Sequence, residues 1–496
     1  MRKTFVIFSL SLLALTGCSD FLNPSPESNY YVESAYKTQD DFEYAINGVY
    51  DAQQSLYSKA DTWMRLGIVR SDEVRAGQGG SSCKGVSTCI NDANVPMLVN
   101  VWQYFWQIIT RSNVILARID AGTFQEESAR DYIKGQAYAL RAWAYYNLCW
   151  QFGGMPIIDE EISLSQVYNV KRSTAAETFE FAENDYKKAI GLLPETWSGT
   201  NVGRITKYAA MGGLARLYVF NSEWSKAKYY LKQIIDCGRY SMAENYEDCF
   251  NDYYDNSPER LWEVQFIGGN TGEGTEFPTG LLPETYNKAS ISDGSMLIPF
   301  NGLSTAMTIA LDFMDAYEQD DKRKAVSTVQ YLNVGGVVEQ KYSYITKYLH
   351  YTYQPTQRTD WACNLPVMRY TDVLMLYAEC LNEEMYSPYS EAFTILNDVR
   401  ARAGLPAKSA TELYDQESFR EALRSERKIE FAFEGLRWWD LLRWNVVEEV
   451  MNEHFATLDN GKNQYQMTEK YRLFPIPFTE ISRYNNEDVM WQNPGF

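Results

Sequence analysis

The residue best placed to carry covalent chemistry is Cys18, the last residue of the stretch LTGC at 15–18. Arg2 and Lys3 stand ahead of it, followed by an apolar run over residues 5–15. A charged region, a short apolar region and a small-residue cleavage site in this order are typical of a bacterial export signal. A cysteine directly after the cut marks the lipoprotein form, in which the thiol becomes a thioether to diacylglycerol and the freed amine is acylated.

We therefore predict a signal peptide over residues 1–17 and an acylated Cys18, which places the chain on a membrane through two or more acyl chains. Proline and polar residues over 18–30 predict an extended leash between the lipid and the body at 31–496. An ordinary secretory signal with an accidental cysteine is the alternative. A membrane-spanning helix fits less well, because the apolar run is short of the ~20 residues that a bilayer core requires.

The other thiols and imidazoles predict no metal or histidine chemistry. Seven cysteines remain besides Cys18, and only two histidines, His350 and His454, occur in the whole chain. No cysteine or histidine spacing resembles a zinc site. Either of two close pairs could form a small disulfide loop in an exported protein, namely Cys83 with Cys89 or Cys237 with Cys249.

We predict no cofactor and no catalytic residue. The glycine-rich stretch at 268–274 lacks the Lys-Ser/Thr pair and the helix start of a phosphate-binding loop, so we interpret it as a flexible loop tip. A structural calcium ion held by loop carboxylates stays possible, although no loop has a recognisable ligand spacing.

Charge and composition exclude some partners. Removing the first 17 of 496 residues leaves 479, and the loss of Arg2 and Lys3 takes the formal charge from −19 to −21. So acidic a body repels nucleic acid and anionic lipid. Aromatic residues make up 15% of the chain, with 37 Tyr and 13 Trp. Much of this aromatic content belongs in the core, and the excess also suits stacking against sugar rings.

Helical periodicity dominates the body. Apolar residues recur at helical spacing in 131–149 and 174–193, and again in two pairs of segments, 205–220 with 223–236 and 368–384 with 389–402. Helix pairs of this size with small residues at close-packing positions predict tetratricopeptide-like hairpins. Ser418 and Glu421 have capping-box spacing, which predicts a helix start there, and Gly435 suits a left-handed helix end.

Loop-like insertions interrupt the helices near 74–98, 258–305 and 328–363. The second insertion begins with a strand-like run at 261–267, and the third alternates enough to predict a hairpin with Gly335 and Gly336 as its turn. Their aromatic residues argue against disorder. We therefore predict a mainly α fold, with long irregular loops and a few short strands on a ligand-binding face.

Several motifs together resemble the SusD/RagB family, the outer-membrane glycan-capture lipoproteins of Gram-negative glycan feeders. They run in the family's order along the chain: CSDFLNP at 18–24, RAWAYY at 141–146, YTDVLMLYAE at 370–379, NDVRARAGLP at 397–406, ERKIEFAFEGLRWWDL at 426–441, LFPIP at 473–477 and QNPGF at 492–496. The resemblance implies a single helical body with tetratricopeptide-like hairpins that support a loop-rich face.

The resemblance also implies a partner and a ligand. The partner would be a SusC-like TonB-dependent outer-membrane transporter, on which the lipoprotein sits as a lid that captures an oligosaccharide at the cell exterior and delivers it for import. In the C-terminal motifs, Glu426, Arg427, Arg437 and Asp440 are expected to lock helices together rather than to act on a substrate.

Ligand contacts are expected around the early Ser-Asp-Glu segment and the mid-chain insertion, by analogy with relatives. A shallow sugar site needs an aromatic platform and planar hydrogen-bonding groups. The residues of these types in the corresponding stretches are Trp63, Arg65, Asp72, Arg75, Phe277, Tyr286 and Phe300. Each of them could equally pack its loop onto the body. Trp102 and Trp106 lie on a helical stripe and are predicted to be core residues.

Two other functions stay open at this level. A peptide-capturing member of the same family would have a large closed cavity instead of exposed aromatic platforms. A lipid-anchored glycoside hydrolase would need two carboxylates about 5–10 Å apart across the scissile bond. The aromatic loops favour the glycan-binding interpretation, without chemistry of its own.

Overall fold

The computed structural model describes residues 35–59, 63–76, 82–90, 92–281, 290–291, 307–330, 332–334, 337–339, 343–350, 352–458 and 465–496. The predicted signal peptide, Cys18 and the predicted leash at 18–30 lie outside these residues, as do Tyr286 and Phe300. No helix of the described part is long and apolar enough to cross a membrane.

The described chain is mainly helical, as the sequence predicts. The α-helices are α2 Gln39–Ser58, α3 Trp63–Arg70, α4 Ser82–Ser87, α5 Pro96–Arg118, α6 Glu127–Phe152, α7 Leu164–Val167, α8 Ala175–Leu192, α9 Lys207–Phe220, α10 Trp224–Asp236, α11 Leu311–Met314, α12 Lys322–Ser327, α13 Tyr370–Glu384, α14 Glu391–Arg402, α15 Gln416–Glu430, α16 Arg437–Arg443, α17 Val447–Thr457 and α18 Phe478–Tyr484. Short 3₁₀ turns lie at Ile119–Ala121, Gly199–Asn201, Tyr246–Phe250, Asp252–Tyr254, Phe277–Leu281 and Glu469–Arg472.

The strands are short and pair only locally. They are β1 Val74–Ala76, β2 Arg260–Val264, β3 Ser290–Ile291, β4 Met307–Ile309, β5 Thr328–Val329, β6 Leu332–Val334, β7 Val337–Glu339, β8 Tyr344–Ile345 and β9 Leu365–Arg369. The antiparallel pairs are β1 with β4, β2 with β9, β3 with β6, β6 with β7, and β5 with β8. Val334 stands opposite Val337, so the predicted hairpin around 335–336 is confirmed.

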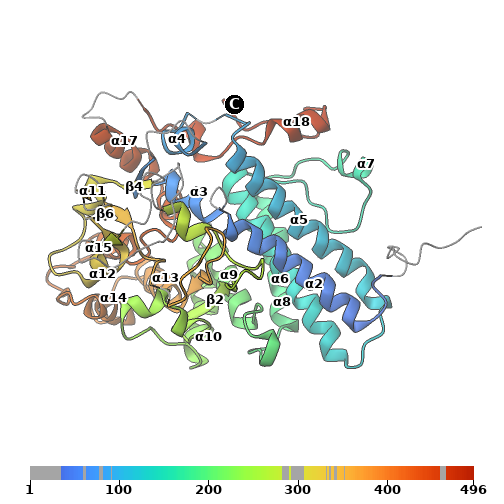
Figure 1. The fold of residues 1–496 in the computed structure, drawn as a ribbon, viewed down its shortest axis with the longest axis horizontal. Helices are drawn as coiled ribbons and strands as arrows, with labels where there is room; N and C mark the ends of the chain where they lie inside the picture. Colours follow the sequence, from blue (N-terminus) through green and yellow to red (C-terminus); the bar gives the residue numbers. More distant parts are fainter. Residues whose placement is uncertain are drawn as a thin grey trace, which may run out of the picture.

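The long helices stack one against the next. Contacts link α2 to α5, α5 to α6, α6 to α8, α8 to α9, α9 to α10, α10 to α13, and α13 to α14. Figure 1 shows α2, α5, α6 and α8 side by side on one side of the molecule, while α11, α12, α14, α15 and α17 gather on the other. The six helical segments predicted from periodicity all fall within this stack, which explains why each has an apolar face.

Local sequence signals fix the helix ends. Thr38 caps α2 in a capping box with Asp41, and Thr174 caps α8 in the same way with Glu177. The predicted start of α15 is wrong by three residues: Asp415 is the N-cap, and Ser418 is the N3 partner of that capping box. The helix also ends at Glu430, before Gly435.

Gly435 serves a packing role between α15 and α16. Its φ of 73° lies in the left-handed region. A Cβ on Gly67 of α3 would stand 2.3 Å from the carbonyl oxygen of Gly435. The two glycines therefore let the backbone of α3 approach the turn between α15 and α16, although they are far apart in sequence.

Buried ion pairs tie the C-terminal helices to the strands. Arg369, at the end of β9, donates to Glu434 at 2.9 and 2.8 Å, to Glu430 at 2.9 Å and to Glu259 at 2.8 Å. Arg402 of α14 also donates to Glu430, at 2.5 Å. Charges buried this deeply need such multiple pairing, because each loses its hydration shell.

Glu426, Arg427, Arg437 and Asp440 are also buried and ion-paired. Arg427 donates to Asp440 at 3.1 Å and to Asp372 at 2.7 Å. Glu426 accepts from Arg400 at 2.9 Å. Each contact joins two different elements, as a packing role for these residues requires.

The two proposed disulfide loops are absent from the described chain. Neither Cys83 with Cys89 nor Cys237 with Cys249 forms a disulfide bond among the described residues. The sulfur of Cys89 lies 3.6 Å from that of Met467, and Cys249 lies 3.8 Å from the guanidinium groups of Arg369 and Arg402. Sequence proximity thus misled, because one thiol of each pair, Cys89 or Cys249, packs against a residue from a distant segment.

The close approach at Gly67 gives a prediction for stability. Gly67→Ala should destabilise the fold by about 1–3 kcal/mol, because the new methyl group meets a backbone oxygen that cannot move aside cheaply. Gly191→Ala is the matched control: nothing lies within 4 Å of its added Cβ, and its helix should gain up to about 1 kcal/mol. Urea unfolding followed by circular dichroism measures both changes. Equal stability of the two variants would contradict the packing assigned to Gly67.

Candidate functional site

The structure does not bring the sequence-predicted ligand contacts together at one surface. Arg65 and Phe277 are each 1% exposed, and Asp72 is 3% exposed. Side chains so enclosed by protein offer no face to a sugar ring, so we no longer treat these three as ligand contacts. Tyr286 and Phe300 lie outside the described residues.

Asp72 is committed to an ion pair. It accepts from Arg437 at 2.8 and 3.1 Å, and the ammonium group of Lys428 lies 3.1 Å away. Burial alone would raise the pKa of Asp72, but the two cations hold it well below its usual range. Asp72 therefore joins the loop after α3 to α15 and α16.

Neighbouring Glu73 is buried without a cation of its own. Its carboxyl accepts from the Phe433 amide at 2.7 Å and from the Ser71 hydroxyl at 3.0 Å. Burial raises the pKa of Glu73 to about 8, and the Asp72 charge adds to the rise that the Phe433 amide opposes. The Glu73 carboxyl is thus largely protonated at neutral pH.

Trp63 and Arg75 lie apart from each other. The ring of Trp63 stacks on Trp439 with centroids 5.4 Å apart and meets Phe105 edge-on at 5.5 Å. Arg75 lies on β1, opposite Thr308 of β4. Trp63 is half-buried in an aromatic cluster that joins α3, α5 and α16. This packing explains a large aromatic side chain at position 63 without a ligand.

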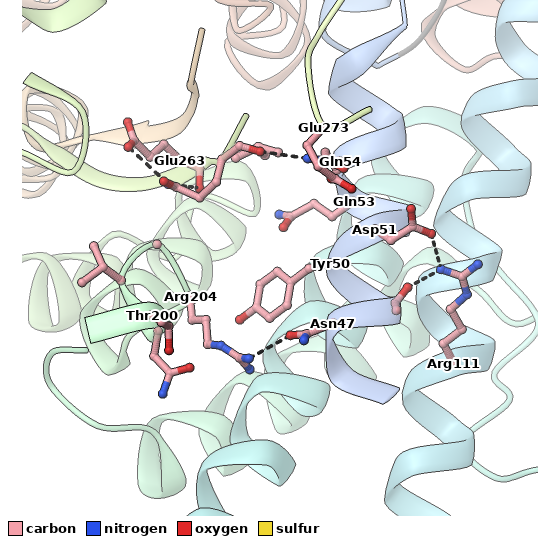
Figure 2. A pocket seen from close by; sticks show the side chains of 16 residues that line it. Asn47, Tyr50, Asp51, Gln53, Gln54, Arg111, Thr200, Arg204, Glu263 and Glu273 are labelled. Atoms are coloured by element: carbon pink, nitrogen blue, oxygen red, sulfur yellow. Dashed lines mark hydrogen bonds and ion pairs between the residues drawn. The ribbon is translucent and has the colours of Figure 1, made fainter. Parts of the chain in front are cut away.

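A polar pocket of about 720 Å³ lies between α2 and the end of β2 (Figure 2). The loop 199–204 closes one side, and Arg111 of α5 and Glu273 stand at its rim. Figure 2 shows Asn47, Tyr50 and Gln53 reaching from α2 toward Arg204 and Glu263. Amides, carboxylates and guanidinium groups dominate the lining, so the pocket presents planar hydrogen-bonding groups from several elements.

Gln53 is the central unsatisfied group of this pocket. Its side chain is 1% exposed, and its amide nitrogen finds no acceptor among the described residues. Leaving a buried donor unpaired costs about 1–3 kcal/mol. At 1% exposure Gln53 is as enclosed as Arg65 and Phe277, so its donor does not face a ligand in the pocket.

Hydrogen bonds hold the groups around Gln53 in place. Arg204 donates to Asn47 at 2.8 Å and to Gln136 at 3.1 Å. The hydroxyl of Tyr50 donates to Gln136 at 3.0 Å and accepts from the Ile205 amide at 3.0 Å. Burial raises the pKa of Tyr50, so its hydroxyl stays neutral as a donor. This side of the pocket is therefore preorganised.

The opposite wall is equally fixed. Gln54 donates to the carbonyl oxygen of Gln265 at 3.0 Å, and Asn364 donates to the side chains of Gln265 at 3.0 Å and Glu263 at 2.9 Å. Glu263 also accepts from Arg260 at 2.6 Å. The wall thus combines α2, β2 and the residue just before β9.

The glycine-rich stretch at 268–274 is held by hydrogen bonds at the edge of this wall. The amides of Gly269 and Asn270 donate to Asp360 at 3.3 and 2.7 Å, and the Gly269 amide also donates to the Tyr353 hydroxyl at 2.8 Å. The amide of Ile267 donates to the Glu273 carbonyl at 2.9 Å. The loop we interpreted as a flexible tip therefore carries ordered contacts that place Glu273 beside the pocket.

The pocket is built to bind a polar ligand. Its cations are already paired: Arg111 with Asp51 at 2.8 Å, and Arg204 with Glu43 at 3.1 Å. No group of three or more His, Cys, Asp or Glu side chains in the described chain is arranged to hold a metal ion. Neutral hydroxyl groups suit such a lining better than charged groups do.

Sequence reasoning named no residue of this pocket as a ligand contact, although Glu263, Gln265 and Glu273 lie in the insertion 258–305 where contacts were expected. A signal for part of it exists: Asn47, Asp51 and Gln54 recur at helical spacing and give α2 a polar stripe beside its buried face. The buried Gln53 and the loop 199–204 had no comparable signal, because their neighbours come from distant segments.

Two family models match the chain. One, described as the SusD family, matches residues 279–496, and the other, described as starch-binding associating with outer membrane, matches residues 20–219. The chain is similar to SusD-like protein P25 of Formosa agariphila, at 25% identity over 97% of this chain and 96% of that protein. It is 28% identical to SusD-like protein P2 of the same organism, over 100% of both.

Solved structures share the fold. Surface glycan-binding protein A from Bacteroides fluxus superimposes with a TM-score of 0.78 at 21% identity, over 93% of this chain and 100% of that chain. A laminarin binding SusD-like protein gives 0.76 at 23% identity over the same shares. Surface glycan-binding protein A from Bacteroides thetaiotaomicron, solved with laminarihexaose, gives 0.76 at 19% identity over 92% of this chain and 100% of that chain.

The protonated Glu73 predicts a pH-dependent stability. Its pKa is about 8 in the folded chain and about 4.3 when unfolded, so the stability it contributes is present at low pH and is lost as the pH rises through this window. Glu73→Gln keeps both hydrogen bonds without a titrating proton. The variant should gain about 1 kcal/mol or more over the wild type between pH 5 and pH 8.

Urea unfolding at several pH values measures this difference. The exposed Glu180→Gln is the matched control, and its difference from the wild type should stay flat. A flat difference for Glu73→Gln as well would refute the assignment of a protonated carboxyl.

Proposed function

The chain belongs to the SusD family, and on that premise we propose that it captures oligosaccharides at the cell surface without altering them, in the polar pocket between α2 and β2. The preorganised planar polar side chains of the two walls, Asn47 with Arg204 on one and Gln54 with Gln265 on the other, are the observation that carries this proposal. Sugar hydroxyls can both donate to and accept from groups of these kinds.

The size and geometry of the pocket fit a short oligosaccharide. Its volume of about 720 Å³ lies within the range of about 300–1,000 Å³ for small-molecule sites. Asn47, Gln54 and Gln265 are amides and Arg204 is a guanidinium, and planar groups of these kinds can each span two neighbouring hydroxyls. The preorganised walls reduce the entropy lost when a sugar binds.

The charge of the lining favours neutral sugars. Arg111 and Arg204 are each paired with a carboxylate, and Asp51, Glu263 and Glu273 also line the pocket. A uronate or sulfate would meet these carboxylates without gaining an uncommitted cation, within an acidic chain of formal charge −19. We therefore assign neutral oligosaccharides as the ligand class.

Two relatives support a glycan as the ligand. One is described as laminarin binding, and another was solved with laminarihexaose. Both are neutral glucans, which agrees with the charge of the pocket. A family model that matches this chain is described as starch-binding and associated with the outer membrane.

Anchoring and delivery complete the proposal. An acylated Cys18 would hold the body on the outer membrane, and a SusC-like TonB-dependent transporter would receive the captured sugar for import. The lipobox at 15–18 and the family membership support both steps. Retention of the lipid on Cys18 in the purified chain is measurable by intact mass.

Bond cleavage has less support than binding at this pocket. Glycoside hydrolysis needs one carboxyl that is free to donate a proton and a second that acts as base or nucleophile. Glu263 is committed to Arg260 and Asn364, and Asp51 is paired with Arg111. We propose that the bound sugar leaves intact.

Gln54→Met tests the binding site. The thioether has the shape of the amide but lacks the donor that binds the Gln265 carbonyl oxygen, so affinity for the bound oligosaccharide should fall about tenfold while the fold keeps its stability. The exposed Gln125→Met, outside the pocket, should leave affinity unchanged. Calorimetric titration against a panel of neutral oligosaccharides and peptides gives the comparison.

Each result of that titration decides between binding at this pocket and one alternative. Unchanged affinity of Gln54→Met would exclude this pocket as the sugar site. Peptide binding without sugar binding would move the chain to the peptide-capturing members of the family. Release of shortened sugars on prolonged incubation would show a hydrolase instead.

Anionic oligosaccharides give a second test of the ligand class. A uronate-containing chain of equal length should bind about tenfold more weakly than its neutral counterpart, because the lining carboxylates repel it. Glu273→Gln removes one rim carboxylate and should reduce the difference in affinity between the two oligosaccharides. A higher salt concentration should reduce the same difference. Tighter binding of the anionic chain would contradict the assigned class.

A further inference from the structure

A second cavity of about 590 Å³ lies on the outer side of α5, away from β2. Helix α5 forms its floor, the segment 158–168 with α7 forms one side, and α18 forms the far end. Figure 1 shows α7 and α18 on the same side of the molecule as α5. We call this cavity the α5 groove. Its apolar side chains are Trp102, Trp106, Ile162, Leu164, Val167 and Tyr484.

The α5 groove exposes apolar surface that a folded chain normally covers. Leu164 is 68% exposed although it faces this cavity, and Trp106, predicted to be a core residue, is only half-buried. An exposed leucine beside a half-buried tryptophan in one cavity leaves apolar surface that an extended segment can cover.

The described chain begins at one end of the α5 groove. The guanidinium group of Arg118, at the end of α5, lies 5.3 Å from the ring centroid of Tyr36. Arg118 also binds Glu161 through two hydrogen bonds of 2.7 Å, and Glu161 lines the groove. The residues that precede Ala35 therefore leave the body next to the groove rather than on another face.

The preceding segment is long enough to span the groove. Arg118 and Trp102 are sixteen residues apart on α5, or about 24 Å at 1.5 Å per residue. An extended chain covers that distance with about 7–8 residues. Residues 19–34 number sixteen, enough for about 50 Å when extended, so the segment can run the whole groove and still reach a lipid on Cys18.

The composition of residues 19–34 also suits the apolar α5 groove. Tyr30, Tyr31 and Val32 would fall beside the Arg118 end, and Phe21 and Leu22 can reach the end formed by α18. We propose that residues 19–34 bind along the α5 groove, so that the predicted leash is an ordered part of the body up to a few residues from the lipid.

The groove favours this occupant over a globular partner. Its cations are already paired, Arg111 with Asp51 and Arg483 with Glu480, so recognition rests on apolar contact. A stable interface between globular proteins buries about 1,200–2,000 Å². A narrow cavity of about 590 Å³ accommodates a single extended segment more readily than such an interface.

Limited proteolysis of the chain from residue 18 to 496, carrying Cys18→Ser, tests the proposal. Chymotrypsin cleaves after Tyr30 and Tyr31 when they are accessible, and intact mass follows the loss of the N-terminal segment. Leu164→Asp places a charge in the groove and should raise the cleavage rate at least about fivefold, because the segment is released.

Leu311→Asp is the matched control. Leu311 is 62% exposed and, like Leu164, is the first residue of a four-residue helix, but it lies outside the groove. Its cleavage rate should equal that of the wild type. Leu22→Asp changes the segment instead of the groove and should also raise cleavage after Tyr30 and Tyr31, which separates release of the segment from damage to the body.

Equal cleavage rates in the wild type, Leu164→Asp and Leu22→Asp would overturn the proposal. A dimer of the wild type that Leu164→Asp dissociates would overturn it as well, since a second copy would then occupy the groove. Faster cleavage in both variants with unchanged thermal unfolding would support it. None of these outcomes depends on whether sugar binds in the polar pocket.

Discussion

The pairing of buried charges is the interaction on which the rest of this structure depends. Arg369 is 1% exposed and Glu430 is 0% exposed, and each contacts several opposite charges from different segments. Removing one partner from such a cluster leaves an uncompensated buried charge, at a cost of about 3–5 kcal/mol. The cluster therefore permits few alternative arrangements of β9, α14 and α15, and it fixes their positions more narrowly than apolar packing alone would.

The ionic cluster around Arg369 also positions one wall of the polar pocket. Arg369 ends β9, and β9 pairs with β2, which carries Glu263 and leads into Gln265. Asn364, just before β9, binds both of those side chains, and Gln54 of α2 completes the wall. A binding surface on the helical stack is thus tied, through two short strands, to an ionic core in the C-terminal half.

Periodicity and motifs predicted the helical stack, the 335–336 hairpin and the packing contacts of Glu426, Arg427, Arg437 and Asp440. These features depend on spacing along one segment or on a family pattern. Asp72 was expected to contact the ligand because its partner Arg437 lies 365 residues away. Without that partner, a short polar stretch near a loop resembles a binding site. Gln53 was missed for the same reason: whether a glutamine in a helix is satisfied depends on neighbours from other elements.

The pairing of Asp72 with Arg437 also sets the order of events during synthesis. Long-range contacts of this kind form late, since the chain between them must first be available and then be confined. The early segment around α3 cannot complete its packing until the chain through α16 is available. A chain cut short before α15 by a premature stop codon keeps Asp72 without its cations, so its N-terminal half stays incompletely folded.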